Sequence, residues 1–209
     1  PLPESFTVCS ATMTEAWGST DNSAPLVTLW GYGDMVFGDG DAWATVDFYA
    51  TPEYTVYEVL VKASYGTDYP ILRATSPAVV YPRQWTRGSL SLDSIASKVR
   101  LVVDGQLLGE EEYKREEDEY RPANLSLLLG YNPITGSEYP IKIADLNVFN
   151  SSLSVERMIN FTRAGEEECG APGDLVNWEE AEWTLHDQAK ATEVDRAWGG
   201  PCRKESKVQ

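Results

Sequence analysis

The sequence contains few arrangements of side chains that could perform acid–base catalysis. His186 is the only histidine among 209 residues, which argues against a catalytic triad and a multi-histidine metal site. Glu180 and Glu182 are spaced so that a strand would place both carboxylates on one face, and hydrolysis of glycosidic bonds uses such a pair. An ordinary exposed strand edge has the same pattern, and no glycine-rich phosphate loop or Cys-x-x-Cys motif accompanies it. We therefore predict no catalytic residue and no enzymatic activity.

A segment rich in aspartate and glycine, residues 31–47, has oxygen atoms that a cation could use. Its acidic residues are Asp34, Asp39, Asp41 and Asp47. Their spacing is not that of an EF-hand loop, and aspartate and glycine are also the residues that surface turns use. We favour the turn interpretation and predict no metal site here.

The chain has three cysteines, Cys9, Cys169 and Cys202, so at least one is unpaired in any intrachain scheme. Cys9 alternates with Phe6 and Val8 in a strand-like run, which favours a small buried side chain, with an intermolecular bridge as the alternative. Cys169 and Cys202 flank the closing segment. We predict a disulfide between them, which would tether the tail to the body and contribute about 3 to 4 kcal/mol in the chain-entropy model.

Composition and charge limit the class of protein. Hydrophobic residues make up 42% of the chain, enough for one sizeable core, and tyrosines, tryptophans, glycines and prolines are typical of an all-β domain. The net charge of −16 repels nucleic acid and anionic lipid. No apolar run is long enough to span a membrane, and we expect no insertion by this segment. The acidic run at 110–119 is predicted to be a solvated loop, with a cation-binding or basic-partner patch as the alternative.

Alternating apolar residues predict a series of antiparallel strands. In residues 98–108 the Asp104-Gly105 pair predicts a tight hairpin, because both residues tolerate positive φ. In residues 124–130 every second residue is leucine, so one face is apolar. Residues 1–16 are expected to form a leader and a first strand. Further strands are expected in the segments 25–30, 45–49, 54–63 and 141–149 and in an edge-like segment that begins at Pro70 and Ile71.

Two local features are expected near the last long strand. The apolar phase flips along residues 141–148, which a β-bulge near Ala144 and Asp145 would explain. After Ser152 or Ser154 as a cap, the apolar residues follow helical spacing with Glu156 in the first turn. This pattern predicts a short helix near 154–161.

The order of these landmarks resembles the pentraxin branch of the laminin-G-like jelly rolls. The resemblance begins with the Phe-Thr-Val-Cys run at 6–9, continues through Trp85 and the strands up to residue 149, and closes with the Gly-x-hydrophobic-x-x-Trp element at 173–178. It implies an all-β fold, a two-sheet antiparallel jelly-roll sandwich with one short helix. We expect residues 1–209 to form a single domain, with the segment 170–209 tethered back onto the sandwich. The ending, through Trp183, the Val-Asp-Arg at 194–196 and Cys202, most resembles the amino-terminal pentraxin domains of adhesion G-protein-coupled receptors.

The resemblance also implies what this chain lacks. Pentraxins hold calcium through acidic and amide residues after the Leu-Gly of the 124–130 strand and through an Asp-Asn pair before a central strand. Here Gly130 is followed by Tyr131, Asn132, Pro133 and Ile134, and Thr-Val-Tyr at 55–57 occupies the other place. These residues offer one side-chain amide, whereas calcium takes six to eight oxygen ligands. We therefore expect the family's calcium site to be absent and the chain to bind no cofactor. The family's first-strand cysteine pairs with one after the tryptophan, a position close to Ser89 in this chain, so that disulfide is also expected to be missing.

Three Asn-x-Ser/Thr sequons begin at Asn124, Asn150 and Asn160, and with the pentraxin-like pattern they favour glycosylation and an extracellular domain. The expected function is non-catalytic recognition, adhesion and self-association at the cell surface, with a homodimer as the simplest assembly. The alternative is a lectin-like domain that binds a glycan or protein ligand, for example on Tyr131 or Tyr139. The residues do not otherwise locate a ligand site.

Overall fold

The computed structural model describes thirteen strands and one helix in the part of the chain given next. The described residues are 5–14, 24–32, 41–50, 55–62, 68–76, 83–93, 95–112, 124–129, 131–132, 137–138, 141–163, 172–177 and 180–182. Cys169, Cys202, His186 and Tyr139 lie outside these residues, as do Asp34 and Asp39. The predicted disulfide and the predicted docking of the tail after residue 182 therefore stay predictions.

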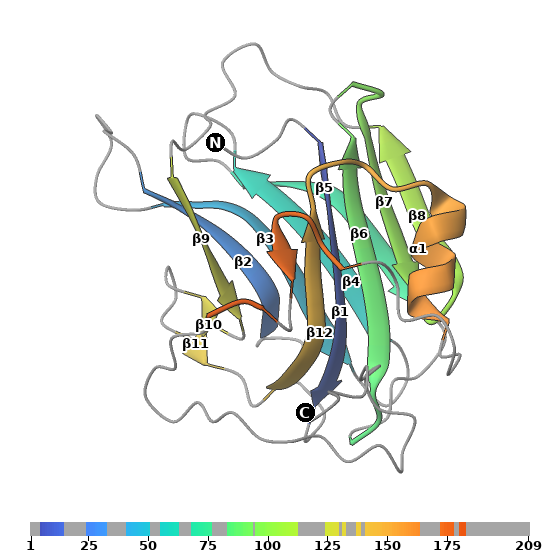
Figure 1. Cartoon of the computed structure of the whole chain (residues 1–209), viewed down its shortest axis with the longest axis horizontal. Coiled ribbons are helices and arrows are strands. Elements are labelled where there is room, and N and C mark those ends of the chain that lie inside the picture. Colours follow the sequence, from blue (N-terminus) through green and yellow to red (C-terminus); the bar gives the residue numbers. More distant parts are fainter. Residues whose placement is uncertain are drawn as a thin grey trace, which may run out of the picture.

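Two antiparallel sheets form a sandwich, and one helix lies on the outside of the larger sheet (Figure 1). The six-stranded sheet has the order β13-β12-β1-β6-β7-β8. Its strands are β1 (Phe6–Thr14), β6 (Thr86–Asp93), β7 (Lys98–Val103), β8 (Gln106–Glu112), β12 (Ile141–Phe149) and β13 (Val176–Asn177). The predicted all-β sandwich with one short helix is confirmed.

The five-stranded sheet has the order β5-β4-β3-β2-β9. Its strands are β2 (Ala24–Tyr32), β3 (Asp41–Ala50), β4 (Thr55–Lys62), β5 (Asp68–Ser76) and β9 (Asn124–Leu129). The predicted edge strand that begins near Pro70 is β5, at the edge of this sheet. Two short strands, β10 (Tyr131–Asn132) and β11 (Ser137–Glu138), pair separately. Asp41 and Asp47 lie in β3, so the turn interpretation is wrong for these two aspartates.

Alternation divides the six-stranded sheet into an inner and an outer face. On the inner face, Val148, Val8, Leu90 and Leu101 are cross-strand neighbours on β12, β1, β6 and β7, and all four are buried. Their direct opposition places one apolar row across four strands, which is how a sheet stabilises its packed face. The side chains one position away in each strand therefore face outward, towards the helix.

The β7–β8 hairpin turns at Asp104 and Gly105, as predicted. Both residues have positive φ, 45° and 77°, the conformation that a two-residue turn of this twist requires. The Asp104 carboxylate accepts a hydrogen bond from the backbone N–H of Arg87 at 2.8 Å, and the backbone N–H of Asp104 donates to the Arg87 carbonyl at 2.9 Å. The turn is thus fixed to the start of β6.

The predicted β-bulge lies in β12. Cys9 pairs with Asn147 and Ala11 pairs with Ala144, so two residues of β12 face Ser10 alone. Asp145 has a φ of 51°, which is typical of the extra residue of a bulge. The extra residue shifts the alternation of β12 by one position after Ala144. This shift explains why the apolar residues change from odd to even positions along the strand.

The helix α1 (Val155–Thr162) has Ser154, one of the two predicted caps, as its N-cap residue. The Ser154 hydroxyl accepts a hydrogen bond from the backbone N–H of Arg157 at 3.3 Å, which satisfies one of the free donors of the first turn. Glu156 lies in that turn, where a carboxylate is favoured by the helix dipole. Met158 and Phe161 are buried and attach α1 to the sheet.

Candidate functional site: the outer face of the six-stranded sheet

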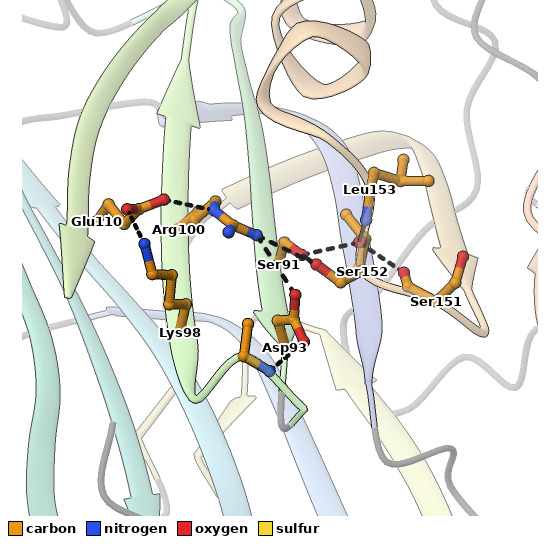
Figure 2. Close-up of polar contacts among 10 residues, drawn as sticks. Ser91, Asp93, Lys98, Arg100, Glu110, Ser151, Ser152 and Leu153 are labelled. Atoms are coloured by element: carbon orange, nitrogen blue, oxygen red, sulfur yellow. Dashed lines mark hydrogen bonds and ion pairs between the residues drawn. The ribbon is translucent and has the colours of Figure 1, made fainter. Parts of the chain in front are cut away.

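A row of polar side chains crosses the outer face of the sheet beside α1. We call it the polar row: Thr7 on β1, Ser91 on β6, Arg100 on β7 and Glu110 on β8. Thr7 pairs with Ser91, Ser91 with Arg100, and Arg100 with Glu110 in the strand ladders. Four neighbouring strands therefore each supply one polar side chain at the same height, as Figure 2 shows for three of them.

The open end of the polar row is a cluster of ion pairs. Arg100 Nε and Lys98 Nζ each donate to the Glu110 carboxylate at 2.6 Å, and Arg100 Nη1 lies 3.7 Å from Asp93. Asp93 also accepts from the backbone N–H of Ala96 at 2.9 Å, which closes the β6–β7 turn. The two bases face two acids, so the cluster carries little net charge. A ligand carboxylate would have to compete with Glu110 for Arg100.

Hydrogen bonds from Lys98 and Arg100 lower the pKa of Glu110 below the ordinary value of 4.5. A lowered pKa stabilises the fold above the ordinary value, and this contribution is lost as the pH falls through the folded-state pKa. We expect Glu110→Gln to lower the melting temperature slightly at pH 7, and the gap to wild type to narrow as the pH falls through the folded-state pKa of Glu110. Thermal melts of both proteins at pH 7 and over a series of acidic pH values test this. A gap that is unchanged at the lower pH values would show that the carboxylate charge is not what stabilises the hairpin.

The inner end of the polar row holds the segment that leads into α1. The Thr7 hydroxyl donates to the Ser151 carbonyl at 2.8 Å and accepts from the Leu153 backbone N–H at 2.9 Å. The hydroxyls of Ser91 and Ser152 are 2.8 Å apart, and Arg100 Nη1 lies 3.4 Å from the Ser152 oxygen (Figure 2). Thr7 is fully buried, so its hydroxyl needs these partners. The row therefore positions the start of the helix.

An apolar cluster lies under α1. It consists of Cys9, Val102, Phe149, Leu153, Met158 and Phe161. Burial raises the pKa of the Cys9 thiol to about 12, so the thiol is neutral at physiological pH and a poor nucleophile. Cys9 thus serves as a small buried side chain, as its strand pattern predicts.

Cys9 lies directly opposite Ser89, and the Sγ and Oγ atoms are 3.0 Å apart. We expect Ser89→Cys to form a cross-strand disulfide with Cys9 under oxidising conditions and to stabilise the fold by about 2 kcal/mol, because the bond restricts the unfolded chain. Mass spectrometry of the linked peptide and denaturant unfolding with and without reductant measure both effects. Ser91→Cys, two residues further along β6, is the control without a cysteine opposite. No linked peptide in the oxidised Ser89→Cys protein would contradict the geometry.

A second anchor joins the bulged strand to the closing element. The Asn147 side chain donates to the Asp145 carbonyl at 3.1 Å and accepts from the backbone N–H of Gly173 at 3.0 Å. The Asp174 carboxylate accepts from the backbone N–H of Asn150 at 2.6 Å. The start of the closing element, at Gly173 and Asp174, is therefore held against the end of β12 on both sides of Phe149.

The structure corrects two expectations about acidic residues. Glu180 and Glu182 are exposed but do not lie on a strand: the backbone N–H groups of Glu180 and Ala181 both donate to the Asn177 carbonyl, which is a turn. Glu110 to Glu112 belong to β8, so the solvated-loop interpretation is wrong for the start of the acidic run.

Within the described ranges, no group of three or more histidine, cysteine or acidic residues is arranged to hold a metal ion. Nor does any helix described here have the length and apolar character needed to cross a membrane.

The three sequons lie in different surroundings. Asn150 is exposed just after β12, Asn160 is exposed on α1, and Asn124 is the first residue of β9. Tyr131, a candidate glycan contact, lies in β10.

Sequence reasoning missed the polar row. The one signal for it is the alternation of the basic residues Lys98 and Arg100 opposite the acidic end of the hairpin.

Comparison with known proteins identifies the fold but no family. No protein-family model matches the chain, and no curated protein matches it. Among solved structures, the heptameric SAP-like pentraxin of Limulus polyphemus is similar with a TM-score of 0.69 and 14% identity, over 89% of this chain and 82% of the pentraxin. The CBM40 domain of a Ruminococcus gnavus IT-sialidase, bound to sialyllactose, is similar with a TM-score of 0.55 and 18% identity over 77% and 84%.

Another similar structure is domain 4 of the extracellular arabinanase AbnA from Geobacillus stearothermophilus, in complex with arabinotriose. Its TM-score is 0.52 and its identity 16%, over 78% of this chain and 68% of that domain. At these identities the likeness is one of fold. The chain has the jelly-roll sandwich of pentraxins and of carbohydrate-binding modules.

Proposed function

We propose that this domain acts by contact and not by catalysis, as a recognition, adhesion and self-association module outside the cell. The observation that supports this most is the fold match to a pentraxin over 89% of the chain, because that pentraxin is heptameric. Fold alone does not fix function, so the proposal also depends on the sequence pattern: three sequons and no set of catalytic side chains.

The finer proposal concerns the parent protein and the assembly. The closing segment resembles that of the amino-terminal pentraxin domains of adhesion G-protein-coupled receptors, so we propose that the domain is the distal module of such a receptor. A homodimer is the simplest closed assembly. Since Tyr131 and Asn132 stand where the family's calcium ligands would be, the proposed association needs no calcium.

Sedimentation equilibrium over a concentration series, in calcium and then in EDTA, tests this function. We expect the molar mass to rise from the 23.2 kDa of one chain towards twice that value, unchanged by EDTA. A single-chain mass at every concentration would reject self-association, and a mass that falls in EDTA would reject calcium independence. Ile95 is 86% exposed at the β6–β7 turn, so it is the first residue to test for a place in the interface, with the variant Ile95→Ser. The matched control is Leu175→Ser, in a different part of the surface.

The second candidate is binding of a carbohydrate. It is favoured by two of the structural neighbours, which were solved with sialyllactose and arabinotriose. The net charge of −16 disfavours an acidic sugar at long range, so the candidate ligand is a neutral glycan. A glycan array probed with the full domain decides between the two functions, because binding to neutral glycans by a protein of single-chain mass supports only the second.

A further inference from the structure

Two of the three sequons lie just before or within α1, and in both the hydroxyl residue is less exposed than the asparagine. Asn150 and Asn160 are exposed, whereas Ser152 is half-buried and Thr162 is 1% exposed. The motif for N-glycosylation includes both groups: the amide that accepts the sugar and the hydroxyl two residues later. Accessibility of the asparagine alone does not make an acceptor.

The Thr162 hydroxyl is held by three neighbours. It donates to the Met158 carbonyl at 2.9 Å, with the Ile159 carbonyl at 3.2 Å as the second acceptor. It also accepts from the backbone N–H of Gly105 at 3.0 Å, which fastens the end of α1 to the β7–β8 turn. The only proton and one lone pair of this hydroxyl are therefore in use inside the fold.

Helix geometry separates the two groups further. Residues two apart on an α-helix do not face the same side, so Asn160 points to solvent while Thr162 points to the sheet. A glycosyltransferase cannot contact both groups while α1 is intact and docked.

The Asn150 sequon is closed less firmly. Ser152 lies in a non-helical segment, and its hydroxyl is 2.8 Å from Ser91 and 3.4 Å from Arg100 Nη1. Opening this segment requires breaking the contacts of Thr7 and Ser152, but it does not require unfolding a helix. Asn150 is thus an internal comparison for Asn160 in the same molecule.

We infer that Asn160 is an N-glycosylation site that accepts its sugar only before α1 forms and docks, and that folding then closes the acceptor and leaves the glycan on the exposed face of the helix. In the reaction the Asn160 amide nitrogen bonds to C1 of the sugar. The bond from C1 to the diphosphate of a lipid-linked glycosyl donor breaks, the diphosphate leaves with the bonding electrons, and the amide loses one proton to a base. That the chain meets such a donor rests on the proposed extracellular function.

The test uses the full chain, produced without glycans and offered to a purified oligosaccharyltransferase with its lipid-linked donor. One sample is native, and the other is held unfolded in a urea concentration at which the enzyme still modifies a control peptide. Occupancy at each asparagine is measured by mass spectrometry of peptides. We expect Asn160 to be modified at least about tenfold less in the native sample, and Asn150 to show a smaller difference.

Two variants separate the motif from the fold. Thr162→Ser keeps the acceptor motif and should be modified in the unfolded sample, while Thr162→Val should be modified in neither. Equal occupancy of Asn160 in native and unfolded wild type, or no occupancy in the unfolded sample, would overturn the inference. Because the purified reaction needs neither a partner nor a cell surface, its outcome is independent of whether the domain self-associates.

Discussion

Replacing Gly173 with alanine is expected to destabilise the domain by about 3 kcal/mol. A Cβ atom at this position would lie 2.6 Å from the carbonyl oxygen and 2.7 Å from the amide nitrogen of Val148, and closer still to the carbonyl oxygen of Val176. All three atoms belong to the backbone of paired strands, so they cannot move away as a flexible side chain would. The closing element would have to leave β12, with loss of the hydrogen bond from Gly173 N–H to Asn147.

Gly88 supplies the control for this substitution. It is the third residue of β6, and a Cβ atom built there meets nothing within 4 Å. Gly88→Ala should be neutral or slightly stabilising, because alanine reduces the freedom of the unfolded chain. Urea unfolding of both variants measures the difference. If the two alanines have equal effects, close packing at Gly173 is not the reason for a glycine there.

Met158→Ala is the second large effect, an expected loss of about 3 kcal/mol. Met158 is fully buried and belongs to the apolar cluster, together with Cys9, Val102 and Phe161. Truncation removes its buried surface and leaves a cavity between α1 and the sheet. The loss is measured by urea unfolding, and the reaction rate of Cys9 with a thiol reagent should rise because the cavity opens a path to the sulfur.

Asn160→Ala is the matched change on the same helix. The asparagine is exposed, and alanine has the higher helix propensity, so this variant should be as stable as wild type or slightly more stable. A comparable loss in both variants would mean that α1 is fixed by its own helical stability and not by the cluster beneath it.

Local chemistry made much of the fold predictable. The Asp104-Gly105 turn, the Ser154 cap and the flip of apolar phase near Asp145 each depend on a few neighbouring residues, and the structure contains all three. The strand segments follow from alternation, which reports the buried face directly. The fold class could be predicted from these strand segments together with the order of the landmarks along the chain.

The polar row was not predictable, because its register depends on a second bulge. A two-residue turn at Asp104 and Gly105 pairs Val102 with Leu107, but the ladder shifts by one residue after that, so Leu101 pairs with Gly109 and Arg100 with Glu110. Without the shift, Arg100 would face Gly109 and not Glu110. In the sequence alone, the acidic run that contains Glu110 resembles a loop. The prediction that Glu180 and Glu182 lie on one strand was wrong for a related reason. The strand β13 ends at Asn177, and a turn follows in place of the expected strand. Backbone pairing decides both cases, and side-chain alternation does not report it.

The central place of β1 in the larger sheet has a consequence for how the chain folds. β1 spans Phe6–Thr14, yet one of its two neighbours is β12 at Ile141–Phe149, and Thr7 bonds to Leu153 across 146 positions of sequence. Contacts of such long range slow folding, because the loop entropy is lost before the contact forms. During synthesis β1 therefore has no strand partner on one side until the residues of β12, up to Phe149, have been made. The time of exposure of this edge to chaperones and to other chains is set by the rate of translation.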